Sequence, residues 1–292
     1  IFMKENMNTK VRGRKDLENL SIPFIGEIPQ YLSAKKKLGF DKHTQSVMKA
    51  IVVKEGNRNI INEAFRVLRS NIDFMAGKDS GQNVFMLTSF NPGSGKSFLA
   101  MNIAMSFAIK KKRILVIDGD LRHGSTSSYV DSPKTGLSDY LGNRVSDWKE
   151  IIVKDEKYDN LHIIPIGTVP PNPTELLEDG KLATLIEVLR SEYDYIFIDC
   201  PPIDIVADAQ IIEKLADRTV FVVRSGLLDR SMLPELENIY QEKRFKNLSV
   251  ILNGTESAGG RYGYRYGYRN GYSSYYGSKG KMGGGGKWVV IK

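Results

Sequence analysis

The segment from Phe90 to Ser97 has the residue types and spacing needed to bind a phosphate group. Its sequence is Phe-Asn-Pro-Gly-Ser-Gly-Lys-Ser, and it lies between an apolar run and a helix-forming stretch. Gly93 and Gly95 allow backbone N–H groups to turn toward phosphate oxygens. Lys96 can reach the β- and γ-phosphates, and the Ser97 hydroxyl can bind Mg²⁺. We therefore predict a P-loop that binds ATP and Mg²⁺, although Phe90 replaces the usual first glycine.

Three aspartates follow predicted strands and add the negative charge that a metal–nucleotide site requires. Asp118 and Asp120 close one apolar run, and Asp199 closes another. Because the carboxyl ends of parallel strands meet at one ligand crevice, we expect all three near the P-loop. Mg²⁺ accepts few protein carboxylates and keeps several waters. Alone, each aspartate would be an ordinary turn residue; together they predict a metal site around the Ser97 hydroxyl.

Short apolar runs separated by helical segments must position these residues. The runs are 84–89, 113–118, 161–166, 194–199, 218–223 and 248–253. They are nearly continuous rather than alternating, which is typical of strands covered on both faces. Segments 97–109, 174–191 and 231–244 are long enough to be crossover helices. The pattern predicts an α/β fold with a doubly wound, mostly parallel sheet of the P-loop NTPase type.

A further helix is predicted before the first of these runs. The apolar residues of its buried stripe recur at helical spacing and are Ile61, Phe65, Leu68, Ile72 and Met75. Its other faces carry charges of both signs, at Glu63, Arg66, Arg69 and Asp73.

The charge of the chain is unevenly distributed. The 292 residues carry a formal net charge of +8, and residues 257–292 hold seven Lys or Arg and no acid. Residues 1–58 hold twelve basic and six acidic residues, which leaves 23 basic and 28 acidic residues for 59–256. We predict a connector arm over 1–58, a catalytic domain over 59–256 and a flexible tyrosine-rich tail over 257–292. The tail is too poor in aliphatic residues to build a core, so we predict disorder there.

Cysteine content and hydropathy bear on the compartment. Cys200 is the only cysteine, so a disulfide within the chain is excluded and a reducing, cytoplasmic compartment is expected. We predict that Cys200 is a small buried residue. No apolar run approaches the roughly 20 residues that span a bilayer. The chain begins at Ile1 rather than Met, which suggests a fragment from which an upstream membrane segment could be missing.

These motifs together resemble the bacterial tyrosine kinases that act with polysaccharide co-polymerases in capsule and exopolysaccharide export. Residues 90–97, 114–122 and 196–202 match the family's Walker A, Walker A′ and Walker B motifs. Glu63-x-x-Arg66-x-x-Arg69 resembles its oligomerisation motif, and residues 25–29 resemble the segment that leads in from the membrane. Residues 171–177 also match, without a mechanism that we can assign. The family ends in a tyrosine cluster, and this chain has one at Tyr262, Tyr264, Tyr266, Tyr268, Tyr272, Tyr275 and Tyr276.

The resemblance implies roles for the site residues. Asp118 and Asp199 would organise Mg²⁺ with Ser97, while Asp120 would orient or deprotonate the acceptor hydroxyl, and Lys96 would act on the transferred phosphate. The implied nucleotide-binding residues are Gly93, Ser94, Gly95, Lys96, Ser97, Phe98, Arg122 and Asn253. Asn253 closes the last strand, where related ATPases place an amide against adenine, although a strand-ending Asn is also a common turn residue.

The implied partners are other copies of the chain in a ring-like homo-oligomer, a membrane-spanning activator segment, N-terminal in the same full-length chain, and a cognate tyrosine phosphatase. The expected location is the cytoplasmic face of the inner membrane, and nucleic acid is not an expected partner. The tyrosines would be phosphorylated in trans. Each phosphate adds between −1.5 and −2 charge, so about four would cancel the tail's positive charge.

Other interpretations remain open from the sequence. Septum-site and plasmid-partition ATPases share the Walker motifs and the fold, but they carry a lysine where this chain has Asn91, and they lack the tyrosine tail. The Arg/Gly/Tyr tail could instead bind RNA or another polyanion, or serve only as a linker. The end of the chain, 287–292, could be a short strand that docks on a sheet edge or an unstructured end.

Overall fold

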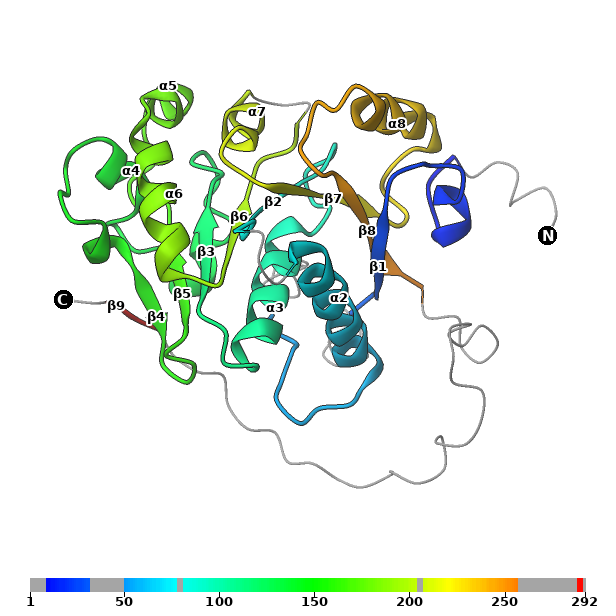
Figure 1. The fold of residues 1–292 in the computed structure, drawn as a ribbon, viewed down its shortest axis with the longest axis horizontal. Helices are drawn as coiled ribbons and strands as arrows, with labels where there is room; N and C mark the ends of the chain where they lie inside the picture. The colour runs from blue at the N-terminus through cyan, green and yellow to red at the C-terminus, as the bar shows by residue number, and fades with distance from the viewer. Residues whose placement is uncertain (1–8, 32–49, 78–80, 204–206, 257–287, 291–292) are drawn as a thin grey trace, which may run out of the picture.

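A computed structural model describes residues 9–31, 50–77, 81–203, 207–256 and 288–290. Within these residues, nine strands form one sheet in the order β1-β8-β7-β2-β6-β3-β5-β4-β9 (Figure 1). The strands are β1 (Phe24–Pro29), β2 (Val84–Thr88), β3 (Ile114–Asp118), β4 (Val153–Asp155), β5 (Leu161–Ile164), β6 (Tyr195–Asp199), β7 (Arg218–Arg224), β8 (Ser249–Thr255) and β9 (Trp288–Val290). Neighbours from β1 to β5 in this order pair in parallel, and only the β5–β4 and β4–β9 pairs are antiparallel. The six predicted runs are all strands of this sheet.

Helices cover both faces of the sheet. They are α2 (Ile60–Ala76), α3 (Lys96–Ala108), α4 (Leu137–Leu141), α5 (Pro173–Glu178), α6 (Lys181–Glu192), α7 (Asp208–Glu213) and α8 (Leu233–Gln241), with 3-10 turns η1 (Arg14–Leu17), η3 (Ser127–Val130), η4 (Trp148–Ile151) and η5 (Arg230–Met232). Apolar residues of α2 and α3 pack in one core cluster, and those of α4 to α8 pack in the other. The predicted doubly wound P-loop NTPase fold is therefore confirmed. No helix of the described residues is long and apolar enough to cross a membrane.

The predicted helices differ from the observed ones in one respect. Segment 174–191 was expected to be a single helix, but the chain forms α5 and α6 with Gly180 between them at φ +78°. This left-handed backbone ends one helix and turns the chain into the next. The helix predicted over 61–75 is α2, whose N-cap Asn59 accepts a 3.0 Å hydrogen bond from the backbone of Asn62.

Part of the segment predicted as a connector arm belongs to the sheet. β1 pairs in parallel with β8, and Ile25 and Ile28 are buried beneath α2. Val52 and Val53 are also buried in the same core cluster. The described residues of 1–58 therefore share the core of the domain that follows them.

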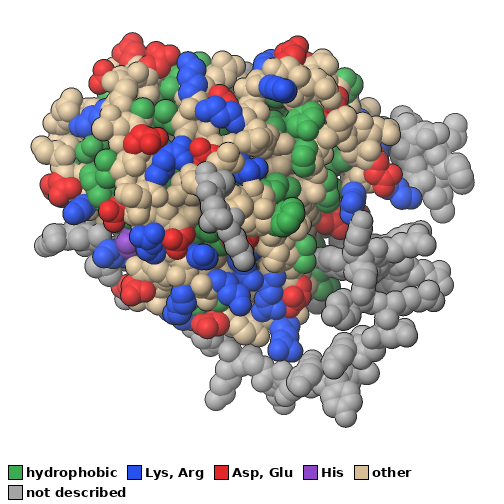
Figure 2. Space-filling view, viewed as in Figure 1, with side chains coloured by type: hydrophobic (Ala, Val, Ile, Leu, Met, Phe, Trp, Pro, Cys, Tyr) green, Lys and Arg blue, Asp and Glu red, His purple; other side chains and the backbone are tan. Residues whose placement is uncertain are grey.

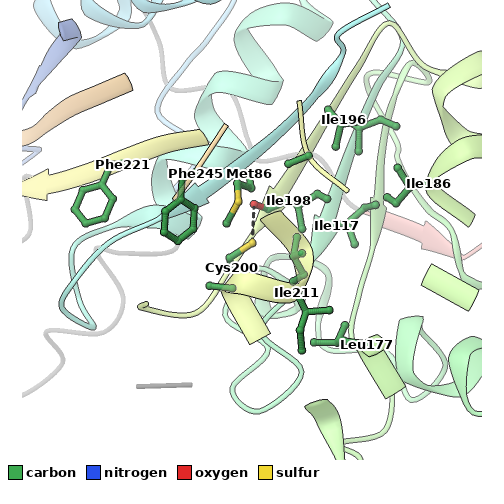
Figure 3. Close-up of a cluster of buried hydrophobic side chains, with 14 of the residues drawn as sticks. Met86, Ile117, Leu177, Ile186, Ile196, Ile198, Cys200, Ile211, Phe221 and Phe245 are labelled. Atoms are coloured by element: carbon green, nitrogen blue, oxygen red, sulfur yellow. Dashed lines mark hydrogen bonds between the residues drawn. The ribbon is translucent and has the colours of Figure 1, made fainter. Parts of the chain in front are cut away.

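Cys200 lies in the core between β6 and α7. Figure 3 shows it among Met86, Ile198 and Ile211, with its sulfur 3.6 Å from the Ile198 carbonyl oxygen. The residue is fully buried, and burial raises the pKa of its thiol. The prediction of a small buried cysteine is confirmed.

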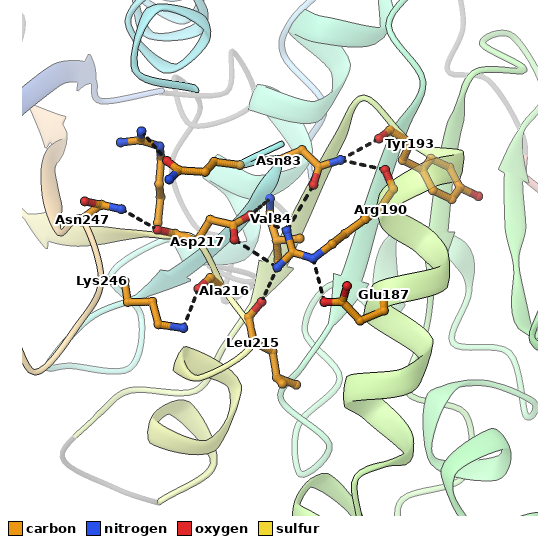
Figure 4. Close-up of polar contacts among 12 residues, drawn as sticks. Asn83, Val84, Glu187, Arg190, Tyr193, Leu215, Ala216, Asp217, Lys246 and Asn247 are labelled. Atoms are coloured by element: carbon orange, nitrogen blue, oxygen red, sulfur yellow. Dashed lines mark hydrogen bonds and ion pairs between the residues drawn. The ribbon is translucent and has the colours of Figure 1, made fainter. Parts of the chain in front are cut away.

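A network of hydrogen bonds and ion pairs lies at the end of the sheet opposite the predicted site (Figure 4). Arg190 of α6 forms a two-pronged ion pair with Asp217, at 2.6 and 3.0 Å. Asp217 in turn accepts a 2.9 Å hydrogen bond from the Val84 backbone, and the Asn83 side chain donates to the Tyr193 carbonyl at 2.9 Å. The network thus joins the segments that lead into β2, β6 and β7, at the amino ends of these strands.

Candidate active site

The predicted P-loop connects β2 to α3. Gly93 and Gly95 have φ angles of +74° and +90°, and α3 begins at Lys96. A Cβ on Gly95 would also lie only 2.3 Å from the Asn253 side-chain nitrogen, so the position requires glycine. That nitrogen donates a 2.8 Å hydrogen bond to the Ser94 carbonyl oxygen. Asn253 therefore holds the loop from the end of β8.

The missing first glycine of the motif has a packing explanation. The Phe90 side chain is 3% exposed, and its ring meets Phe221 of β7 edge to face with centroids 4.9 Å apart. The ring fills the core beneath the loop. Phe98, on the first turn of α3, likewise packs its ring against Phe65 of α2. The side chain of Phe98 is therefore not available to a phosphate. Its backbone N–H is available, because it has no partner within the helix.

Asp118 and Asp199 lie side by side as register partners of β3 and β6. One oxygen of Asp118, Oδ2, accepts hydrogen bonds from the Ser127 backbone and hydroxyl at 2.6 and 2.7 Å. The Oδ2 of Asp199 accepts from the hydroxyls of Ser97 at 2.5 Å and Thr126 at 2.7 Å. The Oδ1 atom of each aspartate is buried and has no hydrogen-bond partner within the described part of the chain.

The pair is electrostatically unusual. Burial, and then the charge of Asp199, raise the pKa of Asp118 from 3.8 to about 8. Burial also raises the pKa of Asp199, against the opposing effect of the nearby Lys96 charge. Two buried carboxylates that keep one oxygen each unpaired are suited to a cation, which would satisfy both. The predicted magnesium ligands Asp118, Asp199 and Ser97 therefore lie together and fit the ion.

Among the described residues, no three carboxylate, imidazole or thiolate groups are arranged to share one metal ion. Asp120, the third predicted carboxylate, lies in the loop after β3 rather than within the Asp118–Asp199 pair. Its Oδ1 accepts from the backbone N–H groups of Arg122 and His123, at 3.3 and 3.2 Å. Its charge still contributes to the raised pKa of both Asp118 and Asp199, so it lies close to the pair. Asp120 is thus positioned as a separate carboxylate beside a two-aspartate cation site.

Arg122 does not contact the P-loop. Its guanidinium pairs with the fully buried Asp208 of α7 at 3.1 Å and donates to the Thr174 hydroxyl at 2.9 Å. Thr174 donates in turn to Asp208 at 2.7 Å. We call these three contacts the Arg122–Thr174–Asp208 triangle. The triangle gives the motif at 171–177 a physical role, because it ties α5 and α7 to the loop that carries Asp120.

Arg224 is a site residue that the sequence analysis missed. It ends β7 beside Asn253, its register partner on β8, and its guanidinium borders Gly95 of the P-loop. Burial lowers its pKa, and its side chain has no hydrogen bond or ion pair within the described residues. The available signal was a charge at the end of an apolar strand, the same signal that identified Asp118.

The remaining predicted residues lie elsewhere. On α2, Arg66 pairs with Glu63 and donates to the Asn57 carbonyl at 2.6 Å, while Arg69 donates to the Ser106 carbonyl at 2.7 Å. They are separate from the P-loop. The seven predicted phosphorylation sites between 262 and 276 lie outside the described residues.

Similarity to known proteins agrees with this site. A family model described as an AAA domain matches residues 82–227. Tyrosine-protein kinase YwqD of Bacillus subtilis is 34% identical over 210 residues, which cover 71% of this chain and 87% of that protein. The chain belongs to the bacterial tyrosine-protein kinase family. The kinase domain of Escherichia coli ETK shares its fold with a TM-score of 0.73 at 28% identity, covering 88% of this kinase and 100% of that domain.

Some relatives are much longer than this kinase. A relative from Klebsiella pneumoniae, named as a tyrosine-protein kinase in the cps region, is 34% identical over 273 residues. This kinase covers 90% of its own length in that match but spans only 36% of the longer protein.

Proposed function

We infer that this kinase transfers the γ-phosphate of ATP to tyrosines of its own C-terminal cluster, in trans within a homo-oligomer. The activity would regulate capsular or exopolysaccharide synthesis and export. The observation that carries this proposal is the arrangement of Asp118, Asp199 and Asp120 beside the P-loop. Two of these aspartates suit a cation, and the third suits an acceptor hydroxyl. The tyrosine cluster supplies the acceptors in this proposal, because it holds seven of the chain's 14 tyrosines.

The residues of this chain account for the steps of transfer. The N–H groups of the P-loop and the Lys96 ammonium hold the β- and γ-phosphates. The phenol oxygen of the acceptor forms a bond to the γ-phosphorus as the bond to the β–γ bridging oxygen breaks, and ADP leaves. The phenol proton passes to Asp120. Asp118, Asp199 and Ser97 would hold Mg²⁺, which would supply charge neutralisation on the phosphates.

The outer face of α2 supports the proposed oligomer. Ile60, Val67 and Phe74 are 62%, 49% and 88% exposed, and they recur every seven residues along one side of the helix. Exposed apolar residues that repeat along one side of a helix are typical of a protein contact surface. Together with Glu63, Arg66 and Arg69 of the same helix, this row is our proposed contact between copies in a ring-like assembly.

The remaining partners are proposed from the family. They are a membrane-spanning activator segment, N-terminal in the same full-length chain, and a cognate tyrosine phosphatase, with the kinase at the cytoplasmic face of the inner membrane. The greater length of the Klebsiella pneumoniae relative supports an additional segment.

Intact mass after incubation with Mg²⁺-ATP tests the activity. We expect a ladder of added phosphates on the wild type, none on Lys96→Met, and none on a variant with all seven cluster tyrosines changed to Phe. Release of ADP without added mass would instead favour a partition- or septum-type ATPase. Tight RNA binding by the unmodified chain, lost on truncation at 257, would favour the polyanion-binding alternative.

Two further measurements test the trans and oligomer proposals. A Lys96→Met chain with an intact tail, mixed with an active chain that lacks 257–292, should gain phosphate at a rate that rises with concentration. If it stays unmodified while wild type modifies itself at a concentration-independent rate, transfer is in cis. Val67→Glu with Phe74→Glu should convert the oligomer to monomer in sedimentation, whereas Val169→Glu, at another exposed apolar position, should not.

A further inference from the structure

A cationic pocket lies between α2 and α3, away from the P-loop. It encloses about 370 Å³ and is closed on one side by the segment 53–58. The cationic side chains that line it are Lys54, Arg58, Arg66, Arg69 and Lys110, against one carboxylate, Glu55. Figure 2 shows Lys and Arg gathered on the surface over the ends of these two helices. We call this feature the α2–α3 pocket.

The wall of the pocket is held in place by buried amides. The Asn102 side chain of α3 accepts hydrogen bonds from the backbone N–H groups of Val52 and Val53, at 2.7 and 3.1 Å. The Asn62 side chain of α2 accepts from the Lys54 backbone at 2.8 Å and donates to the Val52 carbonyl at 3.1 Å. Asn62 and Asn102 are 2% and 0% exposed. The strap at 52–54 is therefore fixed to both helices, and the pocket is preformed.

Most of the positive charge in the pocket is uncompensated. Lys54, Arg58 and Lys110 make no side-chain hydrogen bond or ion pair within the described residues. Arg69 uses one nitrogen on the Ser106 carbonyl, and burial together with the Arg66 charge lowers its pKa. Like charges held this close repel one another, so an anion that bridges them would be stabilised.

We propose that the α2–α3 pocket binds the phosphate group of a phosphotyrosine side chain. Several arginines and lysines around one cavity are suited to a phosphate dianion, which accepts multiple charge-assisted hydrogen bonds. Val53 and Ile109 line the same pocket and give an apolar surface for the aromatic ring. The volume is at the lower end of the range for small-molecule sites, which suits one side chain.

The sequence suggests the source of this ligand. Residues 261–276 carry seven tyrosines, three arginines and no acid. Before modification, this segment is cationic and is repelled by the pocket. Two phosphates would cancel its charge, and further ones would reverse it. The supply of such a ligand rests on the proposed autokinase activity, whereas the binding itself does not.

The pocket also has a direct structural connection to the nucleotide site. α3 begins at Lys96 of the P-loop, and its last turn lies at the pocket, where Arg69 caps the Ser106 carbonyl. A phosphotyrosine bound at Arg66 and Arg69 would also occupy charges of the proposed oligomer contact. The pocket would thus sense the product of the reaction at the surface where subunits meet.

Binding of a synthetic peptide tests the proposal independently of catalysis. The peptide has the sequence of residues 261–268 with phosphate on Tyr264 and Tyr266, and the protein is the full chain with Lys96→Met, which prevents turnover. We expect the phosphopeptide to bind and the unmodified peptide to bind at least tenfold more weakly. Arg58→Ala should weaken phosphopeptide binding about tenfold and Arg58→Ala with Lys110→Ala further, because each removes a charge-assisted hydrogen bond. Lys112→Ala, an exposed lysine outside the pocket, is the matched control and should bind within twofold of its parent.

The alternative outcomes are distinct. Equal binding of both peptides, or unchanged binding in the Arg58 and Lys110 variants, would overturn the proposal. Displacement of the phosphopeptide by inorganic phosphate at equal concentration would overturn it too, because the site would then be a general anion site. Fully modified wild type should bind the peptide less than unmodified protein if its own tail fills the pocket. Unchanged binding there would support the site and assign it to another phosphoprotein.

Discussion

Asp118 of β3 and Asp199 of β6 are register partners on adjacent parallel strands, and each keeps one buried oxygen unpaired in the described part of the chain. Ionisation of both carboxylates costs free energy, because two negative charges would then lie close together away from water. Without a cation, the pair therefore retains a proton at neutral pH. Binding of a cation requires that this proton be released.

The first prediction concerns stability and pH. Burial, with the Asp199 charge, raises the pKa of Asp118 to about 8, so the folded state binds a proton that the unfolded state has already lost above pH 4. The free energy of unfolding should therefore decrease as pH rises from about 4 to about 8, by up to about 1.4 kcal/mol per pH unit from this group. Asp118→Asn should reduce this slope, and Mg²⁺-ATP should reduce it in wild type. Denaturant melts at several pH values measure it, with the exposed Asp131→Asn as control; an unchanged slope in Asp118→Asn contradicts the assignment.

A second prediction separates Asp120 from the cation site. Asp120→Asn should bind Mg²⁺-ATP with nearly wild-type affinity but lose phosphoryl transfer by a factor of about 100 or more, because it removes the proton acceptor. Asp118→Asn should weaken both. Titration calorimetry and tyrosine phosphorylation measure the two effects, and equal losses in both assays for Asp120→Asn would remove its separate role.

The third prediction concerns Arg122. Because Arg122 pairs with the buried Asp208 rather than with the P-loop, Arg122→Ala should cost about 1–3 kcal/mol of unfolding free energy, since it leaves a buried carboxylate unpaired. Thr174→Val, which removes one hydrogen bond of the triangle, should cost about 1 kcal/mol. Thermal melts compare them. Unchanged stability with weakened ATP binding in Arg122→Ala would instead show that Arg122 acts in nucleotide binding.

A fourth prediction addresses the unpaired arginine beside the P-loop. Arg224→Ala should weaken ATP binding about tenfold, and Arg224→Lys should retain part of the affinity. Without ATP, Arg224→Ala should be as stable as wild type or more stable, because removal of an unpaired, half-buried charge breaks no ion pair within the described residues. A large loss of melting temperature without ATP would indicate a structural role instead.

The sequence predicted the parts of the site that depend on local pattern. Continuous apolar runs located β2, β3 and β6, and their carboxyl ends brought Lys96, Asp118 and Asp199 together as the parallel topology requires. Side-chain direction did not follow from the pattern. Arg122 is adjacent to Asp120 in sequence, yet it pairs with Asp208, 86 residues away. A long-range ion pair of this kind has no local signal.

The limits of the arm have a similar cause. β1 joins the sheet through pairing with β8, a contact between residues more than 200 positions apart. Its short run, broken by Gly26 and Pro29, does not have the periodicity of the other strands. The unpaired Arg224 could have been found by the same strand-end rule that located the aspartates.

The pairing of β9 with β4 sets a distance limit on the tyrosine-bearing segment. β8 and β9 lie toward opposite edges of the sheet, and residues 257–287 join them. At about 3.3 Å per residue, such a segment held at both ends extends at most about 50 Å from the sheet, against about 100 Å with its far end released. If transfer runs in trans as proposed, a second kinase molecule would have to lie within this distance of the sheet. The short strand Trp288–Val290 would then be the anchor that sets the limit.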